Sequence, residues 1–345
     1  MNKTLPLFKY LTAGAVTLFV SFSNSQPQSS DGVDINASIV SILEKNDIVF
    51  LGESHAITEQ IATLSAIYSD ARVKAASGAV ATEMVLAQDR PDFESFLWTG
   101  EGRPLFEKRI KDLVWYRYKG YRNLMQTIQH SKWKGCGVDY MDFIHAGSDD
   151  RETIATDRAS IFHTFPDRVQ RKMAEKLSVP IEIVPSAKGP DLIREFSIAA
   201  SILGCIDRFG PKLIVQMGAH HGTSLNPQLR PGILSEGPSM PALDWIHFLR
   251  PDLKIAVVHL GIMNEKTEGE SPFDSLLRRA NASLGSGGPA RLFSTQSFSP
   301  EVRSIMSLQD GDTGEANTYP FPYYGLADYW IFGPPGHQAP RTAGQ

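Results

Sequence analysis

The stretch Asp47–Leu51 (DIVFL), which runs into Gly52-Glu53-Ser54-His55, decides the fold. Its apolar residues follow one another without polar alternation, which is typical of a strand buried on both faces of a sheet. Five other short runs share this character and also end in polar or glycine-rich turns: Ala79–Thr82, Gly135–Val138, Lys212–Met217, Lys254–His259 and Tyr329–Phe332. The sequence therefore predicts six buried strands.

Longer stretches with helical patterns lie between these runs. They are Thr58–Asp70, Arg90–Trp98, Tyr121–Ser131, Arg151–Phe162, Pro166–Lys176 and Pro190–Asp207. Strands that alternate with helices form βαβ units, in which neighbouring strands are parallel. We therefore expect an α/β fold: a mostly parallel central sheet flanked by helices, in a single large domain with a helical insert. The aromatic-rich stretch Asp92–Lys134 is either part of the core or a substrate-binding cap.

The composition limits the classes of protein to consider. The chain has 345 residues, of which 42% are hydrophobic and 21% charged, and its formal net charge is −4. This balance gives no basic surface for nucleic acid or anionic membrane, so neither is an expected partner. The only cysteines, Cys136 and Cys205, cannot build a disulfide framework or a thiolate cluster. We expect two buried thiols that behave as small apolar side chains.

The first residues predict export. Tyr10–Phe22 is an apolar run preceded by Lys3 and Lys9, and it is too short to span a bilayer. We expect a signal peptide over residues 1–23, a polar linker over 24–36, the α/β domain over 37–335 and a flexible tail over 336–345. The domain would then be periplasmic or secreted, with no stable membrane span after cleavage. The alternative is an uncleaved N-terminal anchor.

Acidic residues and histidines follow the predicted strands. In an open parallel sheet, ligands bind beyond the carboxyl ends of the strands, so these positions are the candidates for a site. The first run is followed by Glu53 and His55, with Glu59 one helical turn further on, and the later runs deliver Glu83, Asp139 and the pair His220-His221. The convergence of these residues on one edge is the most informative feature of the sequence.

Two kinds of chemistry suit this set of side chains. Neighbouring carboxylates separate each other's pKa values into a proton donor and an acceptor, and a nearby histidine can act as general base. Alternatively, carboxylates and imidazoles can hold a divalent metal that activates water. Each residue also has an ordinary explanation: Glu53 could cap a helix, and His55 could be a buried histidine. One residue of the pair His220-His221 should point away from the site, because adjacent residues of an extended chain face opposite sides.

The same positions resemble a known superfamily. It groups the erythromycin-esterase-like proteins, the ChaN-type haem-binding proteins and the Tiki/TraB metalloprotease-like proteins. The segments that carry the resemblance, in the family's order, are Ile48–Glu59 (IVFLGESHAITE), Ala79–Met84 (AVATEM), Gly137-Val138-Asp139, Arg194–Ile202 (REFSIAASI), Ile214–Gly222 (IVQMGAHHG) and Asp328–Phe332 (DYWIF).

The resemblance implies a site of Glu53, His55, Glu83, Arg194 and one of the two adjacent histidines. The one-residue spacing between Glu53 and His55 is similar to the haem-binding branch, whereas the acid at Glu59 is similar to the esterase branch. The Tiki branch implies a protease that depends on Mn, Co or Zn. Arg194 could hold a carboxylate or a developing oxyanion, or it could form a structural salt bridge.

We therefore expect an exported hydrolase in which His55, with Glu53 and Glu83, activates water against an ester or amide. A divalent metal (Zn, Mn or Co) could assist. The alternative is a protein that binds haem or iron without turnover; in either case the partner is a small molecule, and the oligomeric state stays open. The expected residues are Glu53, His55, Glu83, His220 and His221 for catalysis, Glu59, Asp139 and Arg194 for substrate binding, and Glu53, His55, Glu83 and His221 for a metal.

Overall fold

A seven-stranded sheet organises the part of the chain that the computed structural model describes: residues 34–101, 118–140, 158–187, 191–226, 239–262, 272–284, 289–306, 323–334 and 336–337. Its strands are β1 (Ile48–Glu53), β2 (Ala79–Leu86), β3 (Gly135–Asp139), β4 (Leu213–Gly218), β5 (Ile255–Leu260), β6 (Arg291–Ser294) and β7 (Tyr329–Phe332). Their order is β3-β2-β4-β1-β5-β7-β6, and every pairing is parallel except that of β6 with β7. The predicted α/β class is confirmed, and the six predicted strands form.

Helices flank the sheet. They are α1 (Ile35–Lys45), α2 (Thr58–Ser69), α3 (Ala71–Ala76), α4 (Arg90–Thr99), α6 (Lys119–His130), α8 (Asp167–Leu177), α9 (Leu192–Phe209), α10 (Ala242–Leu249), α11 (Pro272–Ser283) and α12 (Pro300–Ile305). The predicted helix over Arg151–Phe162 lies partly outside the described residues, and helix is present from residue 158. The predicted signal peptide lies wholly outside them. Within the described ranges, no helix combines the length and the apolarity needed to cross a bilayer.

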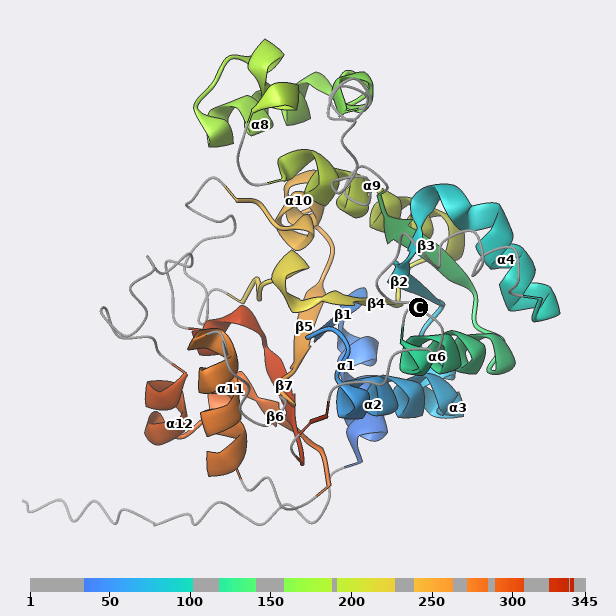
Figure 1. Cartoon of the computed structure of the whole chain (residues 1–345), viewed down its shortest axis with the longest axis vertical. Coiled ribbons are helices and arrows are strands. Elements are labelled where there is room, and N and C mark those ends of the chain that lie inside the picture. Colours follow the sequence, from blue (N-terminus) through green and yellow to red (C-terminus); the bar gives the residue numbers. More distant parts are fainter. Residues whose placement is uncertain are drawn as a thin grey trace, which may run out of the picture. The chain divides into compact units, whose positions relative to one another are not determined.

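Side chains alternate between two cores, one on each face of the sheet. In β1, Val49 and Leu51 belong to a core shared with α1, α2, α3, α4 and α6, whereas Ile48 and Phe50 belong to a core shared with α8, α9, α10, α11 and α12. Figure 1 shows α2, α3 and α6 on one side of the strands and α9 and α10 on the other. This double burial explains why the strands read as continuous apolar runs.

The strand order has a switch point between β1 and β4. The chain leaves β1 towards β2 and β3, returns to insert β4 between β1 and β2, and then crosses β1 to reach β5. The direction of winding therefore reverses at the β1–β4 pair, which is where open α/β sheets bind ligands. The register places Glu53 beside Gly218, the last residues of the two strands.

Cys136 in β3 and Cys205 in α9 form a disulfide, with their Cα atoms 6.1 Å apart. The expectation of two free thiols was therefore wrong. The predicted environments were right, because both residues are buried in one core, on a strand and a helix. What a single sequence could not provide is the register of α9 across β3, which brings the two sulfur atoms together.

In the described part of the stretch Asp92–Lys134, most of the aromatic side chains belong to the core. Tyr121 and Trp133 are buried, and the Trp133 indole N–H donates to the backbone oxygen of Tyr68. Trp98, at the end of α4, is 86% exposed. Residues 102–117 of this stretch lie outside the described part of the chain, and so the cap hypothesis is not tested there.

Gly137 allows a close approach between β2 and β3. The register of this pair shifts between Thr82 and Leu86, and a Cβ atom on Gly137 would lie 2.6 Å from the carbonyl oxygens of Val85 and Leu86. Because backbone atoms cannot move aside, we expect Gly137→Ala to lower the free energy of unfolding by about 1–3 kcal/mol, measured by urea denaturation. The matched control is Gly204→Ala in α9, where a Cβ meets nothing within 4 Å and stability should not fall. Equal loss in both variants would contradict this explanation.

Candidate functional site

Glu53 ends β1 with a buried carboxylate that is held by neighbours on the α6 face of the sheet. Its Oε1 atom accepts hydrogen bonds from the Tyr121 hydroxyl at 3.1 Å and from the Gln216 amide nitrogen at 2.9 Å. Gln216 is oriented by the hydroxyl of Thr82, which donates to its amide oxygen at 2.7 Å. The amide N–H₂ must therefore face Glu53, and so Glu53 is fixed as a hydrogen-bond acceptor.

His55 lies next to this carboxylate. Its Nδ1 atom is 3.4 Å from Glu53 Oε1, at the long end of the hydrogen-bonding range, and its side chain is 32% exposed. The loop that carries it is shaped by Ala56, whose φ of 64° lies in the left-handed region and whose N–H donates to the Tyr121 hydroxyl. A proton on Nδ1 directed at Glu53 leaves Nε2 as the acceptor atom of the ring.

Glu83 ends the regular part of β2 and is held on the opposite face of the sheet, by α9. Its Oε1 atom accepts from Arg194 at 3.1 Å, and its Oε2 atom accepts from the backbone N–H of Gly218 at 2.6 Å. Arg194 also donates to Asp139 Oδ1 at 3.0 Å. All three side chains are largely buried, so Arg194 is the counter-ion that two carboxylates with little access to water share.

His221 extends this buried network. Its ring is fully buried, with Nε2 at 3.1 Å from Glu83 Oε1 and Nδ1 at 2.8 Å from Glu195 Oε1. Glu195 also accepts from the N–H of Ala242 at 2.8 Å. Because both ring nitrogens face carboxylates, both must carry protons to make these hydrogen bonds, and His221 is a cation.

The pKa values of the network follow from this arrangement. Burial by itself lowers the pKa of His221, but the charges of Glu195 and Glu83 raise it to about 10. Burial raises the pKa of Glu83, but the positive charges around it, foremost His221, hold it well below its usual range. Burial, opposed by Arg194 and assisted by the charge of Glu83, raises the pKa of Asp139 to about 6.

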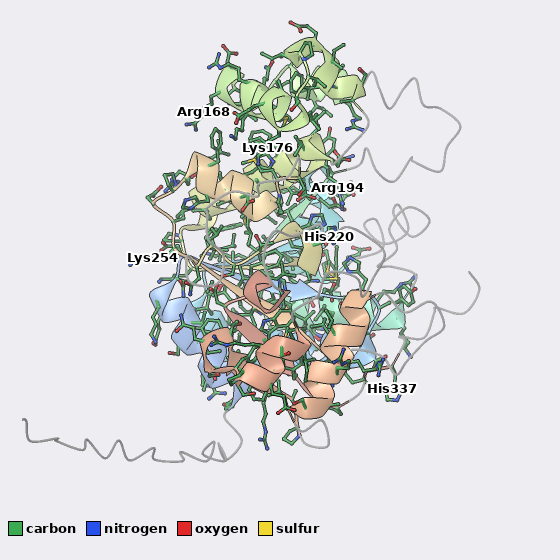
Figure 2. All side chains as sticks on the ribbon, turned by 90° about the vertical axis from the view of Figure 1, so that its left-hand side faces the viewer. Arg168, Lys176, Arg194, His220, Lys254 and His337 are labelled. Atoms are coloured by element: carbon green, nitrogen blue, oxygen red, sulfur yellow. A yellow bond between two sulfur atoms is a disulfide. The ribbon has the colours of Figure 1, made fainter. Side chains whose placement is uncertain are left out.

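His220 and His55 approach each other above Gly218. A Cβ atom on Gly218 would lie 3.0 Å from ring atoms of both histidines, so a side chain there would require the two rings to shift. The protein atoms packed around His220 and the charge of His221 lower its pKa to about 4, although part of its ring surface is exposed. His220 is therefore neutral at pH 7. Figure 2 shows His220 below Arg194, and both lie well away from Lys254.

The predicted residues thus divide between two networks at one edge of the sheet. Glu53 and His55 belong to the α6 face, whereas Glu83, Asp139, Arg194 and His221 belong to the α9 face, and Gly218 separates the two. The sequence predicted that one of the two adjacent histidines would point away from the site, as in an extended chain. Residues Ala219–His221 instead form a 3-10 helical turn, and the ring centroids of His220 and His221 lie 3.8 Å apart. His221 enters the buried network and His220 remains at the surface.

Glu59 has another partner. Its carboxylate accepts from the backbone N–H of His337 and contacts His337 Nδ1, both at 2.5 Å, and the His337 backbone oxygen accepts from Thr58 at 2.8 Å. The acid predicted to contact substrate therefore binds the segment near the C-terminus. Residues 338–345 lie outside the described part of the chain.

The residues of the α9 face include a possible metal-binding group. Glu195, His220 and His221 each offer one ligand atom within 4.8 Å of the others. The arrangement fits a metal poorly, however, because a protonated His221 has no lone pair to donate and Glu195 is engaged by His221 and Ala242. Of the ligands that the sequence suggested, only His221 belongs to this group; Glu53, His55 and Glu83 do not.

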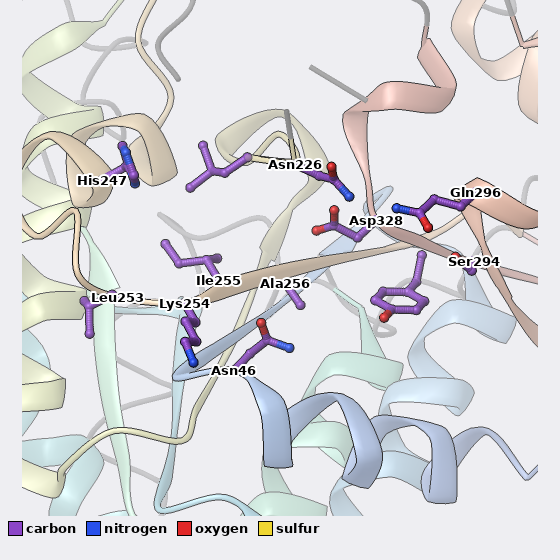
Figure 3. Close-up of a pocket in the computed structure, with 12 residues that line it drawn as sticks. Asn46, Asn226, His247, Leu253, Lys254, Ile255, Ala256, Ser294, Gln296 and Asp328 are labelled. Atoms are coloured by element: carbon purple, nitrogen blue, oxygen red, sulfur yellow. The ribbon is translucent and has the colours of Figure 1, made fainter. Parts of the chain in front are cut away.

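A cavity of about 440 Å³ lies at the other edge of the sheet. Its lining residues include Lys254 and Asp328, which directly precede β5 and β7, and Asn46, two residues before β1; Figure 3 shows their side chains. The lining contains none of the candidate site residues. The cavity is therefore separate from the edge at which the glutamates and histidines gather.

Three residues of the site were not predicted from the sequence: Gln216, Tyr121 and Glu195. Gln216 could have been suspected, because it is the one polar side chain inside the apolar run Lys212–Met217. A buried amide needs partners, and so it points to a polar neighbour on the same face. Tyr121 and Glu195 lie on helices, where the sequence carries no comparable signal.

Fold and site together define a mostly parallel α/β protein with histidines and glutamates at the carboxyl edge of its sheet. No family model matches the sequence, and no curated protein matches it. Among solved structures, a mutant of the erythromycin esterase EreC in its open conformation is similar, with a TM-score of 0.52, 12% identity and coverage of 91% of this chain and 97% of that one.

Two other solved structures are similar. A succinoglycan biosynthesis protein gives a TM-score of 0.53 at 10% identity and covers 90% of this chain and 93% of its own. The haem-bound ChaN of Campylobacter jejuni gives 0.44 at 13%, over 87% and 92%. At these identities the likeness shows the fold alone, and the erythromycin-esterase-like fold implied by the resemblance is confirmed. The Tiki relationship stays a prediction.

Proposed function

We propose that the protein is a hydrolase that uses His55 as the general base for water attack on an ester or amide carbonyl. The observation that carries the proposal is the Glu53–His55 pair. Glu53 is fixed as an acceptor by Tyr121 and Gln216, and it lies 3.4 Å from His55 Nδ1, while the imidazole is partly exposed to solvent. An oriented base beside a buried carboxylate is the arrangement that activates a nucleophile.

The reaction follows from the two ring nitrogens of His55. Nε2 takes a proton from water as the oxygen adds to the carbonyl carbon, and Glu53 stabilises the imidazolium through Nδ1. The tetrahedral intermediate collapses when Nε2 gives that proton to the leaving alcohol or amine, which leaves the carboxylic acid. His220, neutral and beside His55, is placed to donate a hydrogen bond to the developing oxyanion.

The α9 face supports this site without taking part in proton transfer. Arg194 forms salt bridges with Glu83 and Asp139, and its side chain is only 17% exposed, which favours the structural role over oxyanion binding. A metal-assisted variant would place Zn, Mn or Co near Glu195, His220 and His221, and it would require His221 to lose a proton. The proposed mechanism therefore uses no metal.

The test is the variant His55→Ala, assayed on a panel of 4-nitrophenyl esters and anilides. We expect kcat/KM to fall by about 10²–10⁴-fold, the usual contribution of a general base, with the circular dichroism spectrum unchanged. The matched control is His130→Ala, an exposed histidine at the end of α6, which should leave kcat/KM unaltered. Equal turnover by wild type and His55→Ala on every substrate would refute the proposal.

Two further measurements distinguish the proposed hydrolase from a metal-assisted hydrolase and from a haem-binding protein. Treatment with a chelator should leave activity unchanged, whereas its loss together with stoichiometric Zn, Mn or Co in the purified protein would support the metal-assisted variant. Titration with haemin tests the haem-binding alternative. A Soret shift that saturates at one equivalent, combined with no turnover on the panel, would favour a binding protein over a hydrolase.

We also propose that the protein acts outside the cytoplasm. The apolar run Tyr10–Phe22 is typical of a signal peptide, and the Cys136–Cys205 disulfide is supporting evidence, since such bonds persist mainly in oxidising compartments. N-terminal sequencing of the protein recovered from culture medium or periplasm would test this. A mature chain that still begins at residue 1 would indicate the uncleaved anchor.

A further inference from the structure

The disulfide joins the two elements that carry part of the candidate site. Cys136 lies three residues before Asp139 in β3, and Cys205 lies eleven residues after Arg194 in α9. The same strand and helix are therefore connected twice: covalently by the two cysteines and ionically by Asp139 and Arg194, whose atoms are 3.0 Å apart.

Both connections use one face of α9. Eleven residues correspond to about three turns at 3.6 residues per turn, so Cys205 and Arg194 point in the same direction from the helix. Ile198 and Ile202, also on this face, are completely buried between them. The disulfide therefore fixes α9 along its axis at a point about 16 Å from Arg194, given a rise of 1.5 Å per residue.

The position of α9 decides the position of Glu83. Arg194 and His221 both bind Glu83, and Glu195 on the next position of α9 binds His221. Glu83 in turn accepts from the N–H of Gly218, the residue above which His55 and His220 meet. A displacement of α9 by one residue, about 1.5 Å, would break hydrogen bonds of 2.6–3.1 Å along this path.

We infer that the Cys136–Cys205 disulfide is a positioning element of the site, which holds α9 in the register that places Arg194 on Glu83 and Asp139 and thereby fixes Gly218 between His55 and His220. The site is then fully assembled only in the oxidised protein. The expected effect of the disulfide on turnover rests on the proposed function, whereas its expected effect on the Gly218 amide does not.

The first measurement establishes the bond. Full-length protein purified from an oxidising compartment is denatured and treated with iodoacetamide, with or without prior reduction, and its mass is determined. We expect no alkylation without reductant and two additions after it. Two additions without reductant would overturn the inference.

The second measurement compares amide hydrogen exchange in wild type and in Cys136→Ala/Cys205→Ala under native conditions. We expect the Gly218 amide to exchange at least tenfold faster in the double variant. The Val257 amide is the internal control: it lies in β5, which β1 separates from β4, and it donates to the Asp328 carboxylate at 2.9 Å, so its exchange should change little. A merely stabilising bond would accelerate both amides alike, and that result would contradict the positioning role.

Activity gives an independent reading. If the proposed hydrolysis holds, the double variant should lose about tenfold or more in kcat, the scale of effect that misplaced groups produce, while KM changes by less than about twofold. Reductant should reproduce this loss in partly unfolded and refolded wild type, and reoxidation should restore it; the double variant should respond to neither. Absence of turnover in every form, together with selective exchange at Gly218, would refute the hydrolase and leave the inference standing. Unchanged kcat together with equal exchange at both amides would overturn the inference alone.

Discussion

Replacing Arg194 with alanine is expected to lower the free energy of unfolding by about 3–5 kcal/mol, the cost of removing one partner from a buried ion pair. The reason is that Glu83 and Asp139 would keep their burial and lose their shared counter-ion. His221 would then be the only cation that still binds Glu83 among the residues described. Urea denaturation at pH 7, followed by circular dichroism, measures the change.

The matched control lies on the same helix. Arg208, near the end of α9, pairs with Glu94 at the surface, and both side chains are partly exposed. Arg208→Ala should cost no more than about 1 kcal/mol, because exposed ion pairs are worth little. An equal decrease in the free energy of unfolding in both arginine variants would contradict the prediction that the buried ion pairs of Arg194 contribute more to stability than an exposed pair.

Stability should fall as pH rises from neutrality, because His221 is protonated in the folded protein and not in the unfolded chain. Its pKa of about 10 in the folded state compares with about 6.5 for a free histidine. A raised pKa contributes stability that is complete below the unfolded value and is lost as pH rises through the folded value. Between pH 7 and 9 the loss should approach about 2–3 kcal/mol.

The variant His221→Gln isolates this contribution. It should be less stable than wild type at pH 7 and should show a much flatter dependence of the free energy of unfolding on pH between 7 and 9. Asp139, with a pKa of about 6, has finished titrating before this range, and the lowered pKa of Glu83 keeps it charged throughout. Parallel curves for wild type and variant would show that His221 is not the cation that its contacts require.

The sequence alone predicts most of the sheet, because strands that are buried on both faces appear in the sequence as short, continuous apolar runs. The edge strand Arg291–Ser294 was not predicted, because its residues are only partly buried and give no such apolar run. It pairs antiparallel with β7. The location of the site at the carboxyl ends of the strands could also be predicted from the sequence, since parallel pairing brings these ends of β1, β2, β3 and β4 together.

The division of that edge into two networks could not be predicted. Which face Glu53 or Glu83 uses depends on the helix that supplies its partner, Tyr121 from α6 or Arg194 from α9. The register of a helix across a strand is set by tertiary packing and leaves no periodic trace in the sequence. The disulfide was missed for the same reason, and Glu59 was assigned to substrate because the distant His337 could not be placed beside it.

The two networks also set the electrostatic potential that an approaching ligand meets. Glu53, Glu83, Asp139 and Glu195 are four carboxylates, and the cations bound among them are Arg194 and His221. Among these six groups the acidic side chains outnumber the cationic ones by two, and all six are largely buried. The protein interior screens charges less than water does, so the electric field of this acidic excess extends further. These groups therefore attract a cationic ligand and repel an anionic one. Selection by ligand charge is thus built into the same contacts that hold the sheet edge together.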